Sequence, residues 1–417
     1  MKRILSLWMI LILGCSLLTG CSGKVKAADL MEGITKQEGV QTAVPSKEYA
    51  PVLADFTIRL FKSCYSNGDN QLISPLSVIM ALGMTANGAA GETLSQFEKT
   101  FGVPIDTLNQ YLSNYMEKVM AGGEKSILKL ANSIWFADRF NNISQAFLQK
   151  NANFYGAEIY KRVFDSSAAE EINNWIDKNT DGMIKKMLDG FEEDDLMVLI
   201  NALCFDAEWI EPYEEQNVKE GIFTKEDGTV QNVDFMGSAE NIYIEDSQSK
   251  GFVKKYKDRK YAFVALLPNE GISIADYVSS LEGDKLLKLI SSAQNCKVHT
   301  KTPKFSFDYS VSMAEIIKKL GIVDAFDPEK ADFSDMVAEN EERKIFISKI
   351  LHKTYIRVDE KGTKAGAVTM VMTPDSTALP IKIKEPPKVY LDRPFVFMLI
   401  DTESNVPFFI GTVMDVD

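Results

Sequence analysis

The stretch that decides the fold lies near the C-terminal end and reads Val358-Asp359-Glu360-Lys361-Gly362-Thr363-Lys364-Ala365-Gly366-Ala367-Val368-Thr369-Met370-Val371-Met372-Thr373-Pro374. No proline interrupts it between Lys361 and Thr373, so every residue of that run can donate a ladder hydrogen bond. In a strand, alternate side chains face opposite sides. One side would carry only small or β-branched residues, and the charge of Lys364 would lie on the other. We predict that this run can enter a sheet as a strand; a flexible surface loop is the alternative.

The rest of the chain mixes helical and extended patterns. Residues 48–65 have apolar side chains at helical spacing, and Ser74-Pro75 is a typical helix start. Ser167 and Ser312 each precede a glutamate by three residues, as in a capping box. Runs at 196–205, 261–267, 395–400 and 408–413 are rich in apolar, β-branched and aromatic residues and predict strands. Helices dominate early and strands late, so we predict an α+β fold in one domain over residues 47–417.

Composition excludes several function classes. The 417 residues are 45% hydrophobic and 25% charged, with a formal net charge of −13, so nucleic acid is a poor candidate partner. The chain has 2 histidines and 5 cysteines, and these form no HExxH or CxxC motif. Neither GxSxG, GxGxxG nor GxxxxGK occurs. We therefore expect a protein that is not an enzyme and needs no metal or cofactor.

The first residues indicate export. Lys2 and Arg3 precede an apolar stretch at 4–18, and Leu18-Thr19-Gly20-Cys21 resembles the bacterial lipobox. We predict a signal peptide over 1–20, lipidation of Cys21 and a flexible tether over 21–46, which would anchor the protein at the bacterial cell surface or envelope. Ile12-Leu13-Gly14-Cys15 is a second lipobox candidate, and a plain signal peptide is the alternative. Since only Cys64, Cys204 and Cys296 would remain, we predict no obligatory disulfide.

Residues 360–369 resemble the hinge of the serpin family. Further motifs of that family occur elsewhere in the chain, in the order in which the family has them. They lie at residues 70–77, 130–136, 198–205, 209, 303–305, 320–322, 352–353, 392–395 and 407–411. The resemblance covers roughly residues 47–415. It implies three β-sheets, about nine helices and an exposed reactive-centre loop at about 360–391. It also implies a metastable native state and a suicide mechanism, in which a cleaved loop inserts into the main sheet and traps the protease as an acyl-enzyme.

The resemblance assigns three groups of residues. The hinge comprises Glu360, Gly362, Thr363, Ala365, Gly366, Ala367 and Thr369. Lys364 departs from the family, in which glutamate is usual, but as an outward residue it should cost little. A shutter of polar residues beneath the main sheet comprises Ser74, Ser77, Asn201 and His352, which makes His352 a structural residue. Trp209 corresponds to a tryptophan at the breach, the top of the opening sheet.

The resemblance also implies the position of the scissile bond. The family's usual distance from the hinge glutamate, counted from Glu360, gives Ser376-Thr377, within a window of Thr373, Pro374, Asp375, Ala378, Leu379 and Pro380. Counting back from Asp392 gives a site near Ile383 instead. Small residues at 376–378 favour an elastase-like or subtilisin-like serine protease as the target, and we expect the inhibitor to be a monomer. Trypsin-like targets at Lys382 or Lys384, papain-like cysteine proteases, and a non-inhibitory binding function on the same fold remain as alternatives.

Overall fold

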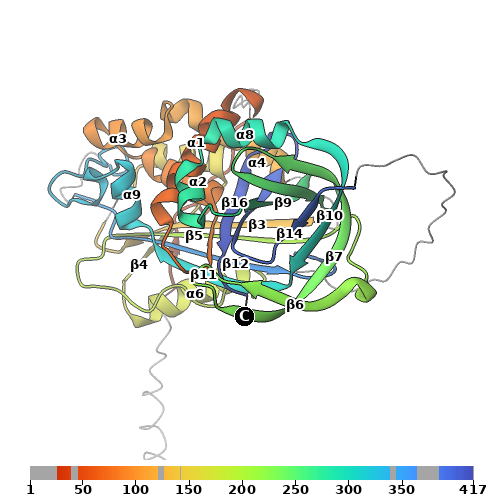
Figure 1. Ribbon diagram of the computed structural model, residues 1–417. Helices are drawn as coiled ribbons and strands as arrows, with labels where there is room; N and C mark the ends of the chain where they lie inside the picture. Colours follow the sequence, from red (N-terminus) through yellow and green to blue (C-terminus); the bar gives the residue numbers. More distant parts are fainter. Residues whose placement is uncertain are drawn as a thin grey trace, which may run out of the picture.

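The computed structural model describes residues 26–38, 46–120, 126–140, 142–338, 344–363 and 385–416 (Figure 1). Within these ranges nine α-helices occur: α1 Ser46–Cys64, α2 Pro75–Ala86, α3 Gly91–Phe101, α4 Ile105–Met120, α5 Gln145–Tyr155, α6 Ser166–Asn179, α7 Ile274–Ser280, α8 Gly283–Ser291 and α9 Ala314–Leu320. None of these helices combines the length and the apolar character needed to cross a membrane. The strands form two hydrogen-bonded sheets, so the predicted α+β class is confirmed.

The first sheet has seven strands in the order β1-β4-β3-β5-β13-β12-β11. Their bounds are β1 Ala28–Asp29, β3 Ser126–Ala137, β4 Glu158–Arg162, β5 Met197–Glu208, β11 Phe305–Ser312, β12 Lys349–Val358 and β13 Gly362–Thr363. At one end of the sheet β5 pairs directly with β12 in parallel, from Val198–Lys349 to Leu203–Thr354. The short strand β13 lies between the same two strands at the other end.

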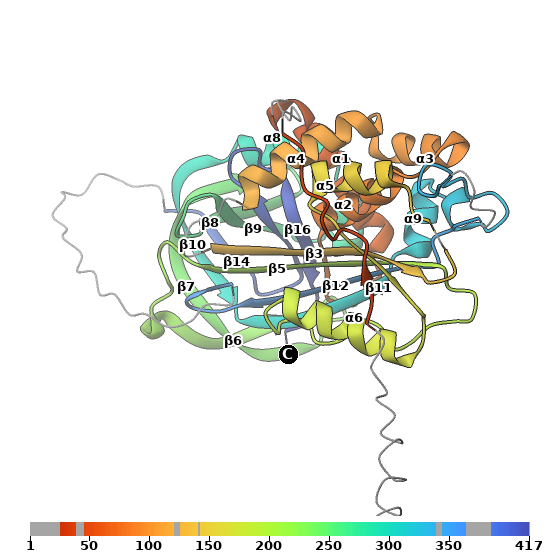
Figure 2. The same ribbon diagram turned by 180° about the vertical axis from the view of Figure 1, so that it is seen from behind.

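Both faces of this sheet are covered. Figures 1 and 2 show α6 on one face and α1, α2, α4 and α5 on the other. In β5 the alternate residues Val198, Ile200 and Cys204 pack with Ile172 and Ile176 of α6, while the intervening side chains enter the larger core on the helical face. A central strand buried on both sides has an unbroken apolar run, and this run is what predicts a strand at 196–205.

The second sheet has nine strands in the order β14-β10-β7-β8-β9-β15-β16-β2, with β6 paired to β7. Their bounds are β2 Gln71–Ile73, β6 Val218–Thr224, β7 Val230–Glu245, β8 Ser249–Lys255, β9 Tyr261–Pro268, β10 Gln294–Pro303, β14 Lys388–Tyr390, β15 Phe395–Asp401 and β16 Pro407–Val413. The long β7 pairs first with β6 and β10 and then, at Tyr243–Glu245, with β8. Strand β7 thereby joins two smaller sheets into one. The structure consequently has two hydrogen-bonded sheets where the resemblance implies three.

Two helix starts differ from their predicted caps. The capping boxes at Ser167 and Ser312 are wrong: Asp165 caps α6 by accepting from the backbone N–H of Ala168, and α9 begins after Met313 without a side-chain cap. Asp165 is the cap because it directly precedes the first helical residue, Ser166. From that position its short carboxylate reaches the free N–H groups of the first turn. The predicted cap at Ser74 is confirmed, since its hydroxyl accepts from the N–H of Ser77.

The predicted tether over 21–46 is wrong for residues 26–38. In this segment β1 pairs antiparallel with β4, and the N–H of Leu30 donates to the carbonyl of Ile159 at 2.9 Å. Lys36 also pairs with Glu117 at 2.6 Å. A polar segment without apolar periodicity carries no sequence signal for an edge strand, because its ordering comes from backbone bonds to a distant partner.

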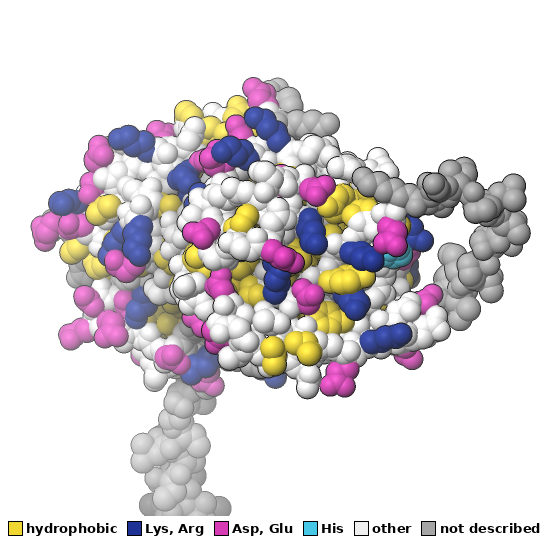
Figure 3. Space-filling model, in the orientation of Figure 1, with side chains coloured by type: hydrophobic (Ala, Val, Ile, Leu, Met, Phe, Trp, Pro, Cys, Tyr) yellow, Lys and Arg dark blue, Asp and Glu magenta, His cyan; other side chains and the backbone are white. Residues whose placement is uncertain are grey.

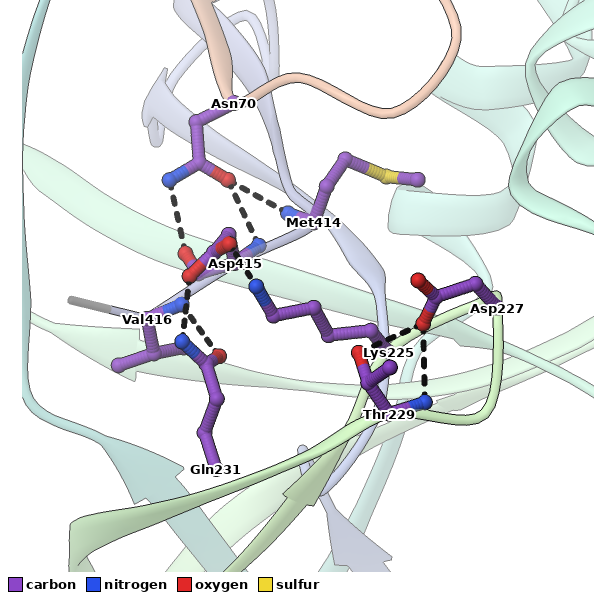
Figure 4. Close-up of polar contacts among 8 residues, drawn as sticks. All are labelled: Asn70, Lys225, Asp227, Thr229, Gln231, Met414, Asp415 and Val416. Atoms are coloured by element: carbon purple, nitrogen blue, oxygen red, sulfur yellow. Dashed lines mark hydrogen bonds and ion pairs between the residues drawn. The ribbon is translucent and has the colours of Figure 1, made fainter.

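Polar contacts hold the end of the chain in place (Figure 4). The Asn70 amide oxygen accepts from the N–H groups of Met414 and Asp415, at 2.6 and 2.9 Å, and its NH2 donates to the Asp415 carbonyl at 2.7 Å. Gln231 donates to the Asp415 carboxylate at 2.7 Å, and Lys225 forms an ion pair with the same group. These contacts attach the end of β16 to the residue before β2 and to the β6–β7 hairpin.

The face drawn in Figure 3 carries lysine, arginine, aspartate and glutamate side chains interspersed with one another. No single sign of charge dominates that face, although the chain as a whole is acidic. Among the described residues, the large apolar side chains that are exposed are Met120, Ile127, Val163, Ile222, Val230 and Val323.

Candidate functional site

The main feature of the site is a short strand wedged between the two central strands of the seven-stranded sheet. Thr363 of β13 pairs with Val358 of β12 on one side and with Ala207 of β5 on the other. Gly362 pairs with Glu208, and a Cβ atom added to it would lie 2.0 Å from the carbonyl oxygen of Ala207. Only glycine fits so close to a neighbouring backbone. The first hinge residues are thus already part of the sheet.

The side chain of Asp359 stabilises the turn that leads into β13. The carboxylate of Asp359 accepts from the N–H of Lys361 at 2.9 Å and from that of Gly362 at 3.3 Å. The backbone N–H of Asp359 donates to the carbonyl of Gly362 at 3.0 Å. The chain therefore runs up β12, reverses at 359–361 and starts down between β12 and β5.

Two aromatic residues bind the three carbonyl groups of this turn. The indole N–H of Trp209 donates to the Asp359 carbonyl at 3.0 Å, and its backbone N–H donates to the Lys361 carbonyl at 2.8 Å. The backbone N–H of Tyr213 donates to the Glu360 carbonyl at 2.8 Å. Trp209, predicted as the breach tryptophan, lies at this end of the sheet and orients the hinge backbone.

The side chain of Thr363 points into the core. It is 1% exposed, and its hydroxyl lies 2.5 Å from the hydroxyl of Tyr256, whose ring stacks on Trp209 with centroids 4.4 Å apart. A larger or charged side chain would have to displace this aromatic stack. The predicted inward direction of Thr363 agrees with this placement.

An ion pair covers the turn from the side of the neighbouring strands. The ammonium of Lys304 lies 2.5 Å from the Glu360 carboxylate and 3.5 Å from that of Asp234. Partial burial raises the pKa of Glu360, but the hydrogen bond and charge of Lys304 outweigh it, so the pKa lies below its ordinary value. The same hydrogen bond raises the pKa of Lys304.

The four predicted shutter residues come together at the start of α2. The His352 ring accepts from the backbone N–H of Ser74 through Nε2 at 3.1 Å, and its Nδ1 contacts the amide oxygen of Asn201. The Ser77 hydroxyl donates to the same amide oxygen at 2.8 Å. Asn201 in turn donates to Asn132 of β3 at 2.9 Å. This buried network connects β12, β5 and β3 to α2 directly under the strands that would have to separate.

His352 is neutral in this network. Its Nε2 faces an N–H group and so must carry a lone pair, while Nδ1 donates its proton to Asn201. Burial lowers the pKa of His352 to about 3. A ring held in this way on both nitrogens cannot exchange protons with solvent as a general base would, so the contacts favour the structural role predicted for it.

The buried histidine predicts a pH effect on stability. Because the pKa of His352 is lower in the folded state than its ordinary value of 6.5, the unfolded chain takes up the extra proton first. This contribution to stability is fully present above pH 6.5 and is lost as the pH falls toward 3. We expect it to change the free energy of unfolding by up to about 1.4 kcal/mol per pH unit in that window.

The comparison is made with His352→Gln, whose amide can accept from Ser74 and donate to Asn201 but does not titrate. Urea unfolding at pH 7, 6, 5 and 4 should show a smaller loss of stability in the variant than in the wild type. Equal slopes for the two proteins would contradict the assignment of a neutral buried ring.

Several predicted site residues lie outside the described residues. These are Cys21, the hinge residues Ala365, Gly366, Ala367 and Thr369, and the whole scissile window with Thr373, Pro374, Asp375, Ser376, Thr377, Ala378, Leu379 and Pro380. Their assignments stay predictions. Of the cysteines inside the described ranges, Cys64 and Cys204 are buried and Cys296 is half-buried, and none of these three forms a disulfide.

Sequence reasoning missed four partners of the site: Asn132, Tyr213, Tyr256 and Lys304. Asn132 lies in the middle of an apolar strand, and a polar residue in such a run is a signal that could have found it. Lys304 lies within the family motif at 303–305, which carried no site assignment, and the two tyrosines look like ordinary residues of strands and connections. In the described part of the chain no cluster of three or more histidine, cysteine or carboxylate side chains is suited to a metal ion.

Comparisons with known proteins agree with this arrangement. The family model described as Serpin (serine protease inhibitor) matches residues 51–416, so the chain belongs to the serpin family. Human serpin B9 is 28% identical over 369 residues, covering 85% of this chain and 96% of the relative. Leukocyte elastase inhibitor A of Mus musculus is 28% identical over 375 residues, covering 86% and 97%.

Solved structures of a thermophilic serpin, tengpin, are similar along nearly the whole chain. The native state is 46% identical, with a TM-score of 0.88 and coverage of 94% of this chain and 100% of that one. The latent state of the same protein gives a TM-score of 0.78, with coverage of 90% and 100%. The arrangement described here is therefore more similar to the native state than to the latent one.

Proposed function

We propose that this protein is a suicide inhibitor of serine proteases that traps its target by inserting the cleaved loop into the seven-stranded sheet. One observation carries the proposal: Gly362 and Thr363 already lie between β5 and β12, and the turn before them is already reversed. Insertion would continue a strand that has begun. In the described residues the direct pairing of β5 with β12 ends at Leu203–Thr354, below this wedge, so those two strands would part further as the loop enters.

The chemistry begins as ordinary proteolysis. The protease serine oxygen attacks the carbonyl carbon of the residue before the scissile bond, predicted as Ser376, and the amide nitrogen of Thr377 leaves with a proton. The loop is then joined to the protease as an ester, and the freed segment can enter the sheet. Water can instead hydrolyse the ester, which releases an active protease and a spent inhibitor. Inhibition succeeds when insertion is faster than hydrolysis.

Loop composition and one relative support the target class. Ser376, Thr377 and Ala378 are small and uncharged, which suits the narrow pockets of elastase-like or subtilisin-like enzymes. A mouse relative of similar length is named leukocyte elastase inhibitor A. We propose that the protein is no enzyme itself, acts as a monomer and has a target serine protease as its macromolecular partner.

A protease panel tests this function. Residues 22–417 are mixed with elastase, subtilisin, chymotrypsin, trypsin and papain, and a complex that survives denaturation is sought on gels. We expect such a complex with elastase or subtilisin, and a released C-terminal fragment that begins within 374–381. A stable complex with papain alone would identify a cysteine-protease inhibitor. Loop cleavage by every enzyme without any complex would favour a non-inhibitory binding protein.

We further propose that the protein is exported and held at the bacterial cell surface or envelope through lipid on Cys21. The support is the sequence Leu18-Thr19-Gly20-Cys21 after a basic and apolar leader. Residues 22–25 would then join the anchor to a folded body that begins near residue 26.

A single substitution tests the anchor. Cys21→Ala should abolish incorporation of labelled fatty acid and move the protein from the membrane fraction to the soluble fraction or the medium. Cys15→Ala is the matched control and should leave both unchanged. Membrane partitioning of Cys21→Ala equal to that of the wild type would count against lipidation at this residue.

A further inference from the structure

A buried ion pair lies beneath the aromatic residues that hold the hinge. Lys254 of β8 lies 2.7 Å from the carboxylate of Glu240 on β7, and their side chains are 2% and 10% exposed. The same carboxylate oxygen accepts from the Ser238 hydroxyl at 2.6 Å, and that hydroxyl lies 2.8 Å from the hydroxyl of Thr300. The pair is thus buried and hydrogen-bonded. A buried ion pair is unusual in a core, because both charges must be removed from water. Apolar side chains of similar size fill the same space without this desolvation free energy.

The lysine of this pair lies against the rings of the two residues that bind the hinge turn, Trp209 through its indole and backbone N–H groups and Tyr213 through its backbone N–H. Its ammonium is 4.2 Å from the centroid of the Tyr213 ring and 5.6 Å from that of Trp209. The two rings meet edge to face, at 89° and 6.3 Å. A desolvated cation is attracted to the faces of aromatic rings and so favours one arrangement of the two.

The contacts form a continuous chain from the ion pair to the hinge. Glu240 holds Lys254, Lys254 contacts the two rings, and Trp209 and Tyr213 bind the carbonyl groups of residues 359–361. Those residues form the turn from which β13 starts. The ion pair therefore lies two contacts away from the backbone that has to stay reversed while the loop enters the sheet.

We propose that Lys254 and Glu240 are positioning residues for loop insertion: their ion pair fixes Trp209 and Tyr213, and through them holds the 359–361 turn ready for the next hinge residues. The inference rests on the proposed function and adds to it the residues that set its efficiency. When the turn is held, insertion starts as soon as the loop is cut. When it is loose, insertion starts later and water hydrolyses a larger share of the acyl-enzyme ester.

The test separates this role from a contribution to stability. Lys254→Met leaves Glu240 buried without its partner, so that variant should be both less stable and less efficient. The double variant Lys254→Met/Glu240→Leu removes both charges and should melt at the wild-type temperature or higher. Its stoichiometry of inhibition should nevertheless rise at least about fivefold, while the rate at which the protease first cuts the loop stays within about twofold. Lys254→Arg keeps a cation over the rings and should remain close to the wild type.

Lys225→Met is the control, because it removes an ion pair with Asp415 at the β6–β7 hairpin and leaves the ion pair of Lys254 with Glu240 in place. It should leave the stoichiometry of inhibition unchanged. A double variant that folds and inhibits with wild-type stoichiometry would overturn the proposal. So would a double variant that does not fold, because the pair would then be a structural requirement.

A further measurement keeps the inference testable if no protease is trapped. The loop is cut by a protease that is not inhibited, and the rate at which the cut protein becomes resistant to unfolding by urea is measured. A rate at least about fivefold lower in the double variant than in the wild type would support the positioning role even though the proposed inhibition had failed. Equal rates would refute the role without affecting the proposed function.

Discussion

A single cut in the chain between Met372 and Pro380 is expected to raise the melting temperature of the protein, with both fragments still associated. Thr363 is already paired, so the freed segment 364–371 can then extend β13 between β5 and β12, with successive residues bonding alternately to the two neighbouring strands. The direct bonds across the six β5–β12 residue pairs are lost in exchange, and at about 1 kcal/mol net for each additional bond the balance is of the order of 10 kcal/mol. In a domain of this size that corresponds to a rise of roughly 10 °C or more.

The control is a cut in another surface turn. The β6–β7 turn at 225–229 closes through a backbone bond of 2.8 Å between Lys225 and Thr229 and leads into no gap between strands. A protease site introduced there should leave the melting temperature unchanged or lower it, as a nick in an ordinary turn does. Calorimetry before and after each cut makes the comparison. A fall or no change after the cut at 372–380 would mean that the scaffold does not insert its loop.

Thr363→Arg is expected to turn the inhibitor into a substrate. The side chain at this position is 1% exposed and lies against Tyr256 and the aromatic stack, so an arginine there would bury an unpaired charge or expel β13 from the sheet. Burial of an unpaired charge costs several kcal/mol, and each 1.4 kcal/mol is a factor of ten in a rate or an equilibrium. The stoichiometry of inhibition should therefore rise about tenfold or more, while the protease still cuts the loop.

Thr363→Ser is the matched variant, because it keeps the hydroxyl that meets Tyr256 and adds no volume. It should inhibit almost as well as the wild type. Both variants are titrated against the same protease, with the residual activity and the cleaved inhibitor measured together. Inhibition by Thr363→Arg at the wild-type stoichiometry would exclude insertion of the hinge as the mechanism.

Local patterns in the sequence determined the elements and much of the site. The strand predicted at 196–205 corresponds to β5 within a few residues. A strand covered on both faces is apolar along nearly its whole length, so the sequence alone reveals it. Ser74 before Pro75 placed the start of α2 correctly, since capping depends only on the next three residues. The hinge could likewise be picked out as a proline-free run of small residues, whereas the shutter residues were assigned only by resemblance to the serpin family.

The tertiary structure alone decided how these parts meet. The bond between Ser74 and His352 joins residues 278 positions apart, and nothing near either residue indicates the other. The strand partner of residues 28–29, the seating of Gly362 and Thr363 between β5 and β12, and the burial of Lys254 with Glu240 depend on neighbours from distant parts of the chain. Lysine and glutamate in a strand are solvent-facing residues by any local rule. Their charges become a buried pair only because β7, β8 and the Trp209 segment close over them, and such long-range packing is recorded in the fold and in no local pattern.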